Sequence, residues 1–340
     1  MSMEKWYQKR GKDDDIVIST RIRLARNLRS LPFIEKMTKN QQLELNERVK
    51  DALEHSNPGD NKWHMISLQE LSDSQQMSLV ERHLVSHTFI EQPENKLLIL
   101  SEDNGTSIMV NEEDHLRIQT LCSGLDLEGT YEACSRIDDL LDEQLDYAFD
   151  DTLGYLTVCP TNLGTGLRAS VMLHLPALER TQIIPQLIKT VSRLGLTIRG
   201  TYGEGTGVVG ATYQVSNQVT LGLSEETAIS NLQNVVRQII ENERAARKEI
   251  LKNNIDIIDE ICRSYGVLKY ARLLSGNEFY SHISNVRLGV SENILQKTSI
   301  ETLNTLLNQV GTATLCAASG QTLNPKERDF SRAKIVRDAL

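Results

Sequence analysis

The sequence predicts an α+β fold in which an antiparallel sheet is flanked by helices and followed by an all-helical C-terminal region. Up to about residue 254, short apolar runs bounded by turn residues are mixed with longer runs of helical spacing. Beyond that point only helical patterns remain. Since 340 residues are enough for two domains of roughly 150 residues each, we expect one domain at residues 1–254 and a second at residues 255–340.

The first part of the chain predicts two helices and a hairpin. Residues 40–56 and 72–87 have apolar side chains at helical spacing, and a Pro-Gly pair interrupts the pattern between them. Residues 96–100 and 106–111 are short apolar runs separated by a turn that contains Asn104-Gly105. Asn-Gly is typical of tight hairpin turns, so these two runs are expected to pair as antiparallel strands.

The remaining elements follow from the same two periodicities. Ser224 is well placed to cap a long helix from Glu225 to about residue 252. Residues 211–215 and 219–223 are expected to pair as strands through the turn at Ser216-Asn217-Gln218. Further helices are expected at residues 130–149, 177–194, 255–265, 269–274, 278–288, 299–310 and 325–340, and a further strand at residues 196–200.

Composition and charge exclude several classes of protein. The net charge of −9 is unlike that of a protein that binds nucleic acid over a broad surface. The 5 cysteines are widely spaced without a CxxC pair, which argues against a disulfide framework or a structural zinc site and fits a reducing compartment. No apolar run resembles a signal peptide or a membrane span. We therefore expect a cytoplasmic protein with no direct contact to nucleic acid or membrane.

The stretch most informative about function is TVCPTNLGTGLRAS at residues 157–170. It places Cys159 beside a turn-forming proline, a glycine-rich loop and Arg168. Such a loop can hold a thiolate near a cation and direct backbone N–H groups at an anion. Taken alone, Cys159 could equally be a small buried hydrophobic side chain.

Five segments together resemble the phosphagen (guanidino) kinases, which move a phosphoryl group between ATP and a guanidinium. The segments are VISTRIRLARNL at 17–28, VNEEDHLRI at 110–118, CPTNLGT at 159–165, IRGTYGE at 198–204 and YQVSNQVTLG at 213–222, in the family's order. The resemblance implies the catalytic fold of these kinases, which is similar to that of glutamine synthetase, with ATP and Mg²⁺ as cofactors.

Two departures from that family narrow the resemblance. Phosphagen kinases carry a small helical domain before the catalytic domain, whereas here the first motif begins at residue 17. They also have no helical domain after the catalytic one. Both features of this chain are similar to those of the bacterial protein arginine kinases (McsB type), which use the same catalytic domain.

The resemblance implies that a set of polar and basic side chains binds the phosphates of ATP. Arginine suits this role because its planar fork donates to two oxygens at once and stays charged. Arg21 and Arg23 are two residues apart, so on a strand they project from one face. Each arginine alone would be an ordinary surface residue. The implied ATP-binding residues are Ser19, Arg21, Arg23, Arg117, Arg168 and Arg199, and no metal-ligating set of side chains is predicted.

The acceptor guanidinium requires a carboxylate. Its pKa above about 12 leaves its nitrogens without a lone pair to offer, so a partner must orient it and accept a proton. The resemblance implies Glu113 and Glu204 for this role, with Glu112 in support. It implies that Cys159 positions the guanidinium as a thiolate. From the residues alone, Glu112-Glu113-Asp114 could instead be a solvated acidic turn.

Two patterns suggest other chemistry and are rejected. Residues 205–210 read GTGVVG, but the residues that follow alternate like strands, whereas a dinucleotide fingerprint requires a helix. We expect a loop beside Glu204 that can close over the substrate. His83 and His87 are four residues apart with no third ligand after them, which favours surface histidines over a zinc site. The strand near residues 98–102, where the family has a nucleotide-binding histidine, contains none.

A second motif, RDFSRA, lies at residues 328–333, on a helix that Asn324-Pro325 would start. On spacing alone it is a solvated charged helix, in which Asp329 can pair with Arg332. The motif resembles the RDxxRA element with which protein arginine kinases bind phosphoarginine. This implies Arg328, Asp329 and Arg332 as phosphoarginine-binding residues, although Arg337-Asp338 offers a second arginine–aspartate pair nearby.

The sequence thus predicts an ATP-dependent kinase of arginine side chains in proteins. A kinase of free arginine or another small guanidine, and a non-catalytic phosphoarginine-binding adaptor, are the alternatives. The resemblance also implies partners in a bacterial stress response: protein substrates with exposed arginine, including a stress-gene repressor, a small zinc-binding activator and a Clp-type protease. A homodimer through residues 255–340 is expected, because isolated helical domains often self-associate.

Overall fold

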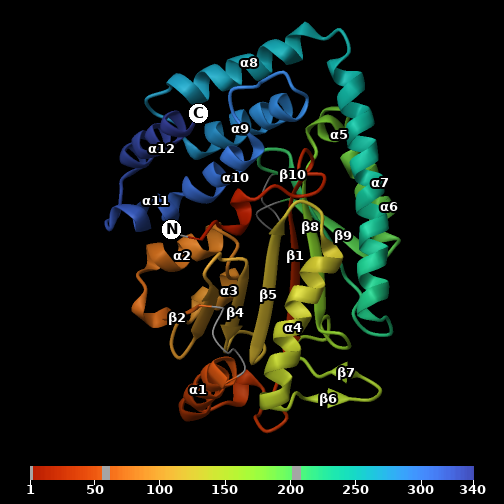
Figure 1. Cartoon of the computed structure of the whole chain (residues 1–340), viewed down its shortest axis with the longest axis vertical. Coiled ribbons are helices and arrows are strands. Elements are labelled where there is room, and N and C mark those ends of the chain that lie inside the picture. Colours follow the sequence, from red (N-terminus) through yellow and green to blue (C-terminus); the bar gives the residue numbers. More distant parts are fainter. Residues whose placement is uncertain (1–2, 56–61, 201–207) are drawn as a thin grey trace.

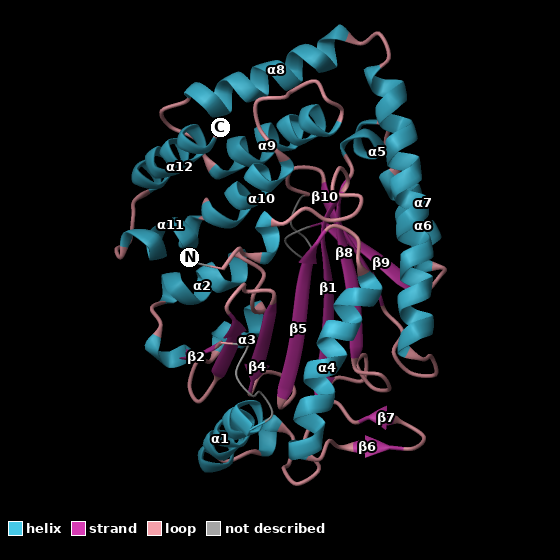
Figure 2. Cartoon of the chain, in the orientation of Figure 1, coloured by secondary structure: helices cyan, strands magenta, loops and turns pink. Residues whose placement is uncertain are grey.

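The computed structural model describes residues 3–55, 62–200 and 208–340. Its centre is an eight-stranded sheet with the order β2-β3-β4-β5-β1-β8-β10-β9, in which every described pairing is antiparallel (Figures 1 and 2). The predicted α+β architecture is therefore confirmed. The strands of this sheet are β1 Val17–Arg26, β2 Trp63–Ser67, β3 Leu97–Ser101, β4 Thr106–Val110, β5 Leu116–Ser123, β8 Leu167–His174, β9 Leu196–Gly200 and β10 Thr212–Asn217. Strands β6 Phe149–Asp150 and β7 Gly154–Tyr155 form a separate short ribbon.

Helices cover one face of this sheet. Strand β1 buries Ile22 and Leu24 in the main apolar core together with residues of α4 and α7, whereas Arg21 and Arg23 alternate with them and point to the opposite face. At β1, one face of the sheet is thus anchored by apolar burial and the other can carry charged side chains. Farther along the sheet the second face is apolar too, because Leu98, Met109 and Leu121 cluster there with Leu79 and Phe89. The helices of this part are α1 Lys39–His55, α2 Asp73–Glu81, α3 His87–Glu91, α4 Leu127–Leu145, α5 Pro176–Arg180, α6 Ile184–Ser192 and α7 Glu225–Leu251.

Two predicted helices are each interrupted near a residue with a left-handed backbone. The helix predicted at residues 72–87 ends at Glu81, His83 follows with a φ of 59°, and Ser86 then caps the separate helix α3, which begins at His87. Gln182, with a φ of 58°, separates α5 from α6 in the same way. Apolar spacing continues across both breaks, so periodicity alone does not reveal them.

The prediction of a strand at residues 219–223 was wrong. The hydroxyl of Thr220 in this segment donates to the backbone oxygens of Thr161 and Leu163, at 3.0 and 2.7 Å. In return, the backbone N–H of Thr165 donates to the oxygen of Thr220 at 3.1 Å. The segment therefore holds the cysteine-containing loop in place and does not close a hairpin.

Strands β2, β5 and β8 and helix α11 were not predicted, although β5 and β8 are the two neighbours of β1. Six of the eight residues of β8 are buried, on both faces of the sheet, and some of them are polar. Such a strand lacks the clean alternation of apolar and polar residues that identifies a half-exposed strand.

Beyond α7 the described chain is helical, as predicted. These helices are α8 Ile255–Tyr270, α9 Gly276–Ser291, α10 Ile300–Gln309, α11 Thr312–Ser319 and α12 Pro325–Ala339. Helices α8, α9, α10 and α12 share an apolar core of their own, and α11 buries Leu315 and Cys316 in a separate small cluster with Leu323. The predicted helix at residues 269–274 was wrong, since α8 continues to Tyr270 and the following residues are irregular. Within the described ranges, no helix combines the length and apolar character required to cross a bilayer.

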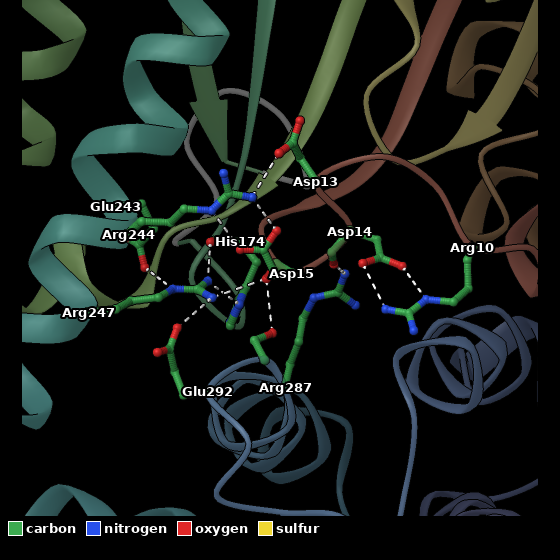
Figure 3. Close-up of polar contacts among 11 residues, drawn as sticks. Arg10, Asp13, Asp14, Asp15, His174, Glu243, Arg244, Arg247, Arg287 and Glu292 are labelled. Carbon is green, nitrogen blue, oxygen red and sulfur yellow. Dashed lines mark hydrogen bonds and ion pairs between the residues drawn. The ribbon is translucent and has the colours of Figure 1, made fainter.

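A network of charged side chains ties the C-terminal helices to the sheet (Figure 3). Arg247 of α7, which is fully buried, donates to the backbone oxygens of Asp15 and His174, at 3.1 Å each. Arg287 of α9 donates to the backbone oxygen of Asp14 at 2.9 Å. Because a buried ion that loses its partners is costly, these contacts hold α7 and α9 against the ends of β1 and β8.

Candidate active site

Five of the predicted site residues line one cavity. It has a volume of about 200 Å³ and lies on the charged face of the sheet, where β5, β1 and β8 are neighbours. The predicted residues in it are Arg23, Glu113, Arg117, Cys159 and Arg168, and Ala25, Thr161, Asn162 and Gly166 complete the lining. Segments that are far apart in the sequence thus meet here.

Arg23 and Arg168 lie directly opposite each other on neighbouring strands, and Arg21 lies opposite Ser170. Like charges in opposite positions destabilise a sheet. We call Arg21, Arg23, Arg117 and Arg168 the arginine cluster. The two-residue spacing predicts that Arg21 and Arg23 share a face, but only the strand register brings Arg168 against Arg23.

Burial and mutual repulsion lower the pKa values within the arginine cluster. Burial, followed by the charges of Arg117 and Arg168, lowers the pKa of Arg21 to about 10. The pKa of Arg23 is lowered well below its usual value, first by burial and then by the charge of Arg21. The Nε of Arg23 has no hydrogen-bond acceptor among the described residues. Concentrated positive charge with an unused donor is an arrangement that a polyanion would stabilise.

The acidic motif holds Arg117 from two sides. Nη1 of Arg117 donates to Glu112 at 3.0 Å, and Nη2 donates to Glu113 at 2.9 Å. Glu112 is buried behind Arg117, where it also accepts a hydrogen bond from the hydroxyl of Ser86, and it does not line the cavity. Glu113 is half-buried and does line it. The neighbouring glutamates are therefore in different environments, which their sequence does not distinguish.

Buried polar groups fix the loop that carries Cys159. The carboxylate of Asp114 accepts from the backbone N–H of Val158 at 2.8 Å and from the side-chain amide of Asn27 at 2.6 Å. The Sγ of Cys159 lies 3.0 Å from the hydroxyl oxygen of Thr161. Asp114 and Asn27 belong to motifs visible in the sequence, but their role as anchors of this loop was missed because it depends on contacts between distant segments.

Arg168 is oriented by Asn217, a second residue that was missed. Nη1 of Arg168 donates to the backbone oxygen of Asn217 at 2.7 Å, and the Asn217 side chain accepts from the N–H of Ala169 at 2.8 Å. Arg199 lies on β9 near Arg168, since its charge adds to burial in lowering the pKa of Arg168. Glu204 falls outside the described residues.

Two further cavities lie beside the arginine cluster along β1 and β8, and both are lined by Ser19, His83 and Met172. Arg21, Leu121, Ser170 and Gln214 complete the lining of the smaller one. The other, about 60 Å³, is more apolar and is lined by Trp6, Tyr7, Ile18, Ser19, Glu81, His83, Met172, Val209, Thr212, Tyr280, Asn304, Leu307 and Asn308. We call this larger one the second cavity. The prediction that His83 is a surface histidine was wrong: it is partly buried, and it lines both of these cavities.

The free energy of unfolding is expected to fall as the pH drops from about 6.5 toward 4. Burial and the charge of Arg21 lower the pKa of His83 from 6.5 to about 4, so in this range the unfolded chain binds a proton that the folded chain does not. Stability rises with pH wherever the unfolded state binds more protons, so this contribution is present above pH 6.5 and is lost on acidification, by at most about 3 kcal/mol. Urea unfolding of a His83→Gln variant should show a weaker pH dependence than the wild type. The same change at exposed His55 should not, and an equal effect would contradict the assignment.

The C-terminal motif is only partly exposed. Arg332 is buried, and it donates to the backbone oxygens of Val310 and Leu274 at 3.0 and 2.8 Å and to the carboxylate of Asp329 at 2.9 Å. Arg328 and Asp329 are half-buried and can reach solvent. The prediction of a solvated charged helix therefore fails at Arg332, which joins α12 to the end of α10.

Both parts of the chain match families of known proteins. Residues 44–246 match the family model of the ATP:guanido phosphotransferase C-terminal catalytic domain, and residues 254–340 match that of the protein-arginine kinase McsB C-terminal domain. The protein-arginine kinase of Clostridium acetobutylicum is 45% identical over 339 residues, which cover 99% of this chain and 100% of that protein. That of Halothermothrix orenii is 44% identical over 340 residues, which cover 100% and 97%.

Solved structures show the same catalytic fold. Lombricine kinase matches with a TM-score of 0.61 and 28% identity, over 72% of this chain and 70% of its own. The duplicated taurocyamine kinase of Schistosoma mansoni with bound transition state analog components matches with a TM-score of 0.61 and 28% identity, over 73% of this chain and 37% of its own. Given these structures, the two family models and the nearly full-length relatives, the chain belongs to the protein-arginine kinase family.

Proposed function

We propose that this chain transfers the γ-phosphoryl group of ATP to the guanidinium of arginine side chains in proteins. The observation that carries the proposal is the cavity in which Arg23, Arg117 and Arg168 lie beside Glu113 and Cys159. Phosphoryl transfer requires mainly positioning and charge neutralisation. Cations for the phosphates and a carboxylate for the guanidinium, in one cavity, supply both.

On the phosphate side, the arginine cluster would bind ATP, with Ser19 and Arg199 contributing from the same sheet. The residues fit a polyanion, because Nε of Arg23 lacks an acceptor among the described residues and Arg23 faces the like charge of Arg168. Mg²⁺ would accompany the nucleotide and supply further charge neutralisation at the phosphate oxygens. Glu112 would act indirectly, by holding Arg117.

On the acceptor side, Glu113 and Glu204 would orient the guanidinium and accept its proton. The Oε2 of Glu113 accepts from Arg117, which leaves other lone pairs of the carboxylate for a substrate. As the reaction proceeds, the bond from the γ-phosphorus to the bridging oxygen breaks, an N–P bond forms, the nitrogen loses a proton to the carboxylate, and ADP leaves. Cys159, which lines the same cavity, would help to position the guanidinium.

An assay with Mg-ATP tests the proposal, with free L-arginine in one sample and an unfolded arginine-rich protein in another. We expect phosphate on the protein only, and we expect mild acid to release it, because protonation at nitrogen makes the N–P bond labile. A Glu204→Ala variant should bind ATP but transfer nothing, which controls for a contaminating kinase. Phosphate on free arginine would indicate a small-guanidine kinase. No transfer in either sample, with phosphoarginine still bound, would indicate an adaptor.

We further propose a division of roles between residues 1–254, which would carry catalysis, and residues 255–340, which would carry homodimerisation and phosphoarginine binding. The match of residues 254–340 to a protein-arginine kinase domain supports this division. Arg328 and Asp329 are accessible enough to contact a phosphoarginine, whereas Arg332 would hold the helix that presents them.

For the cellular role, we propose a cytoplasmic enzyme of the stress response. Its family resemblance suggests that it marks proteins, including a stress-gene repressor, for a Clp-type protease and that a small zinc-binding protein activates it. The 5 cysteines, none of them in a disulfide, suit a reducing compartment.

A further inference from the structure

Helix α11 receives its N-terminal cap from a distant part of the chain. Its own N-cap residue is Gly311, which has no side chain to accept a hydrogen bond. The carboxylate of Glu81, at the end of α2, takes this role. It accepts from the backbone N–H groups of Ala313 at 2.9 Å and Thr314 at 2.8 Å, and from the hydroxyl of Thr314 at 2.8 Å. A helix N-terminus favours such a negative charge.

The fit between Glu81 and Gly311 is close. A Cβ atom added at Gly311 would lie 2.1 Å from Oε2 of Glu81, so no larger residue leaves the carboxylate where it is. The φ of Gly311 is −57°, which any residue can adopt. Glycine is thus required here for space and not for backbone conformation, and this makes the contact easy to break from either side.

The cap lies between two groups of residues that line the second cavity. Glu81 lines that cavity itself, and His83, two residues later, lines it from the side of the sheet. On the opposite side, Asn304, Leu307 and Asn308 of α10 line it, and α10 ends just before Gly311. The hydrogen bonds of Glu81 thus join the segment that carries His83 to the segment that follows α10.

We propose that Glu81 is a positioning residue for nucleotide binding, through which the C-terminal helices form one wall of the nucleotide site. The inference rests on the proposed function and adds one premise to it, namely that ATP extends from the arginine cluster past Ser19 into the second cavity, which Ser19 also lines. Loss of the cap would let α10 and α11 move away from His83 and widen that cavity. Nucleotide affinity would then fall, whereas the groups around Cys159 and Glu113 would keep their places.

Three variants test the proposal: Glu81→Ala, Gly311→Ala and the double variant. In each, the Kd for Mg-ADP, measured by calorimetry, and the KM for ATP should rise about tenfold, with kcat within about twofold of the wild type. The double variant should be no worse than either single one, because both changes remove the same contact and Glu81→Ala also removes the carboxylate that Gly311→Ala would meet. A loss of kcat with unchanged KM, or additive effects in the double variant, would overturn the proposal.

An Asn254→Ala variant is the matched control. It removes the N-cap of α8, whose side chain accepts from the N–H of Ile257, and it should lower the melting temperature by a similar amount without changing the Kd for Mg-ADP. An equal rise in Kd in this control would reduce Glu81 to a general stabilising role and overturn the proposal. Mg-ADP can be bound in the absence of an arginine substrate. A wild type that binds Mg-ADP without phosphorylating arginine would therefore contradict the proposed function, but the Kd values of the variants would still test the role of Glu81. A wild type that does not bind it would overturn the inference itself.

Discussion

An Arg23→Met variant is expected to transfer phosphoryl groups about a thousandfold more slowly than the wild type and yet to unfold at a higher temperature. In the proposed mechanism, Arg23 would face the charge that develops on the transferred phosphoryl group. In the ligand-free protein, however, it is partly buried, it faces Arg168, and its Nε has no acceptor among the described residues. Methionine fills similar space without the repulsion or the desolvation of a cation.

The measurement is kcat/KM for protein phosphorylation beside a thermal unfolding scan without nucleotide. Arg263→Met is the control, because Arg263 is exposed and pairs only with Asp259 on its own helix. It should change neither quantity much, since exposed ion pairs contribute little. A variant at Arg23 that loses stability together with activity would show that Arg23 stabilises the fold, and the assignment to the phosphate site would fail.

The same reasoning predicts that nucleotide stabilises the wild type more than it stabilises the Arg23 variant. A ligand that binds only the folded state raises its stability in proportion to the logarithm of ligand concentration over Kd. We thus expect the arginine cluster to lower the stability of the protein without nucleotide and to raise its affinity for phosphates, as functional sites commonly do.

A Glu113→Gln variant is expected to lose kcat by about a thousandfold while its KM for ATP changes by no more than a few-fold. Glutamine has nearly the same shape and can still accept from Arg117, so the phosphate side should stay in place. It cannot take a proton from the acceptor guanidinium, and it binds that cation without the charge of a carboxylate.

Its neighbour Glu112 offers an internal comparison. Glu112 contacts Arg117 from the buried side and does not line the cavity. A Glu112→Gln variant should therefore act mainly through Arg117 and raise the KM for ATP, with a smaller loss of kcat. Steady-state kinetics with varied ATP and varied protein substrate separate the two patterns. If both variants gave the same profile, Glu113 would have no special role toward the acceptor.

Local sequence patterns were sufficient to predict several of these features. The pairing of Asn104-Gly105 with its flanking apolar runs predicted the β3–β4 hairpin, and Ser224 predicted the start of α7. The two-residue spacing of Arg21 and Arg23 placed them on one face of β1. Because these features depend only on residues that are close in the sequence, residue propensity and hydrophobic periodicity are sufficient to predict them.

Other features depend on which distant segments meet. The left-handed turn at His83 breaks a helix that periodicity continues, and it sends that histidine into the second cavity. Residues 219–223 have the alternating pattern of a strand, but the hydroxyl of Thr220 donates hydrogen bonds to the loop that contains Cys159. In both cases tertiary contacts override a local preference.

By itself, then, the sequence determined the family, the α+β class and five of the side chains that line the candidate active-site cavity, because motifs of charged residues and helix or strand periods are local properties of a chain. Only the tertiary structure decided that Arg168 opposes Arg23, that Glu112 lies behind Arg117 and that Glu81 caps α11. Strand register and contacts between distant helices are set by packing of the whole core, where a shift of one residue moves every side chain to the other face.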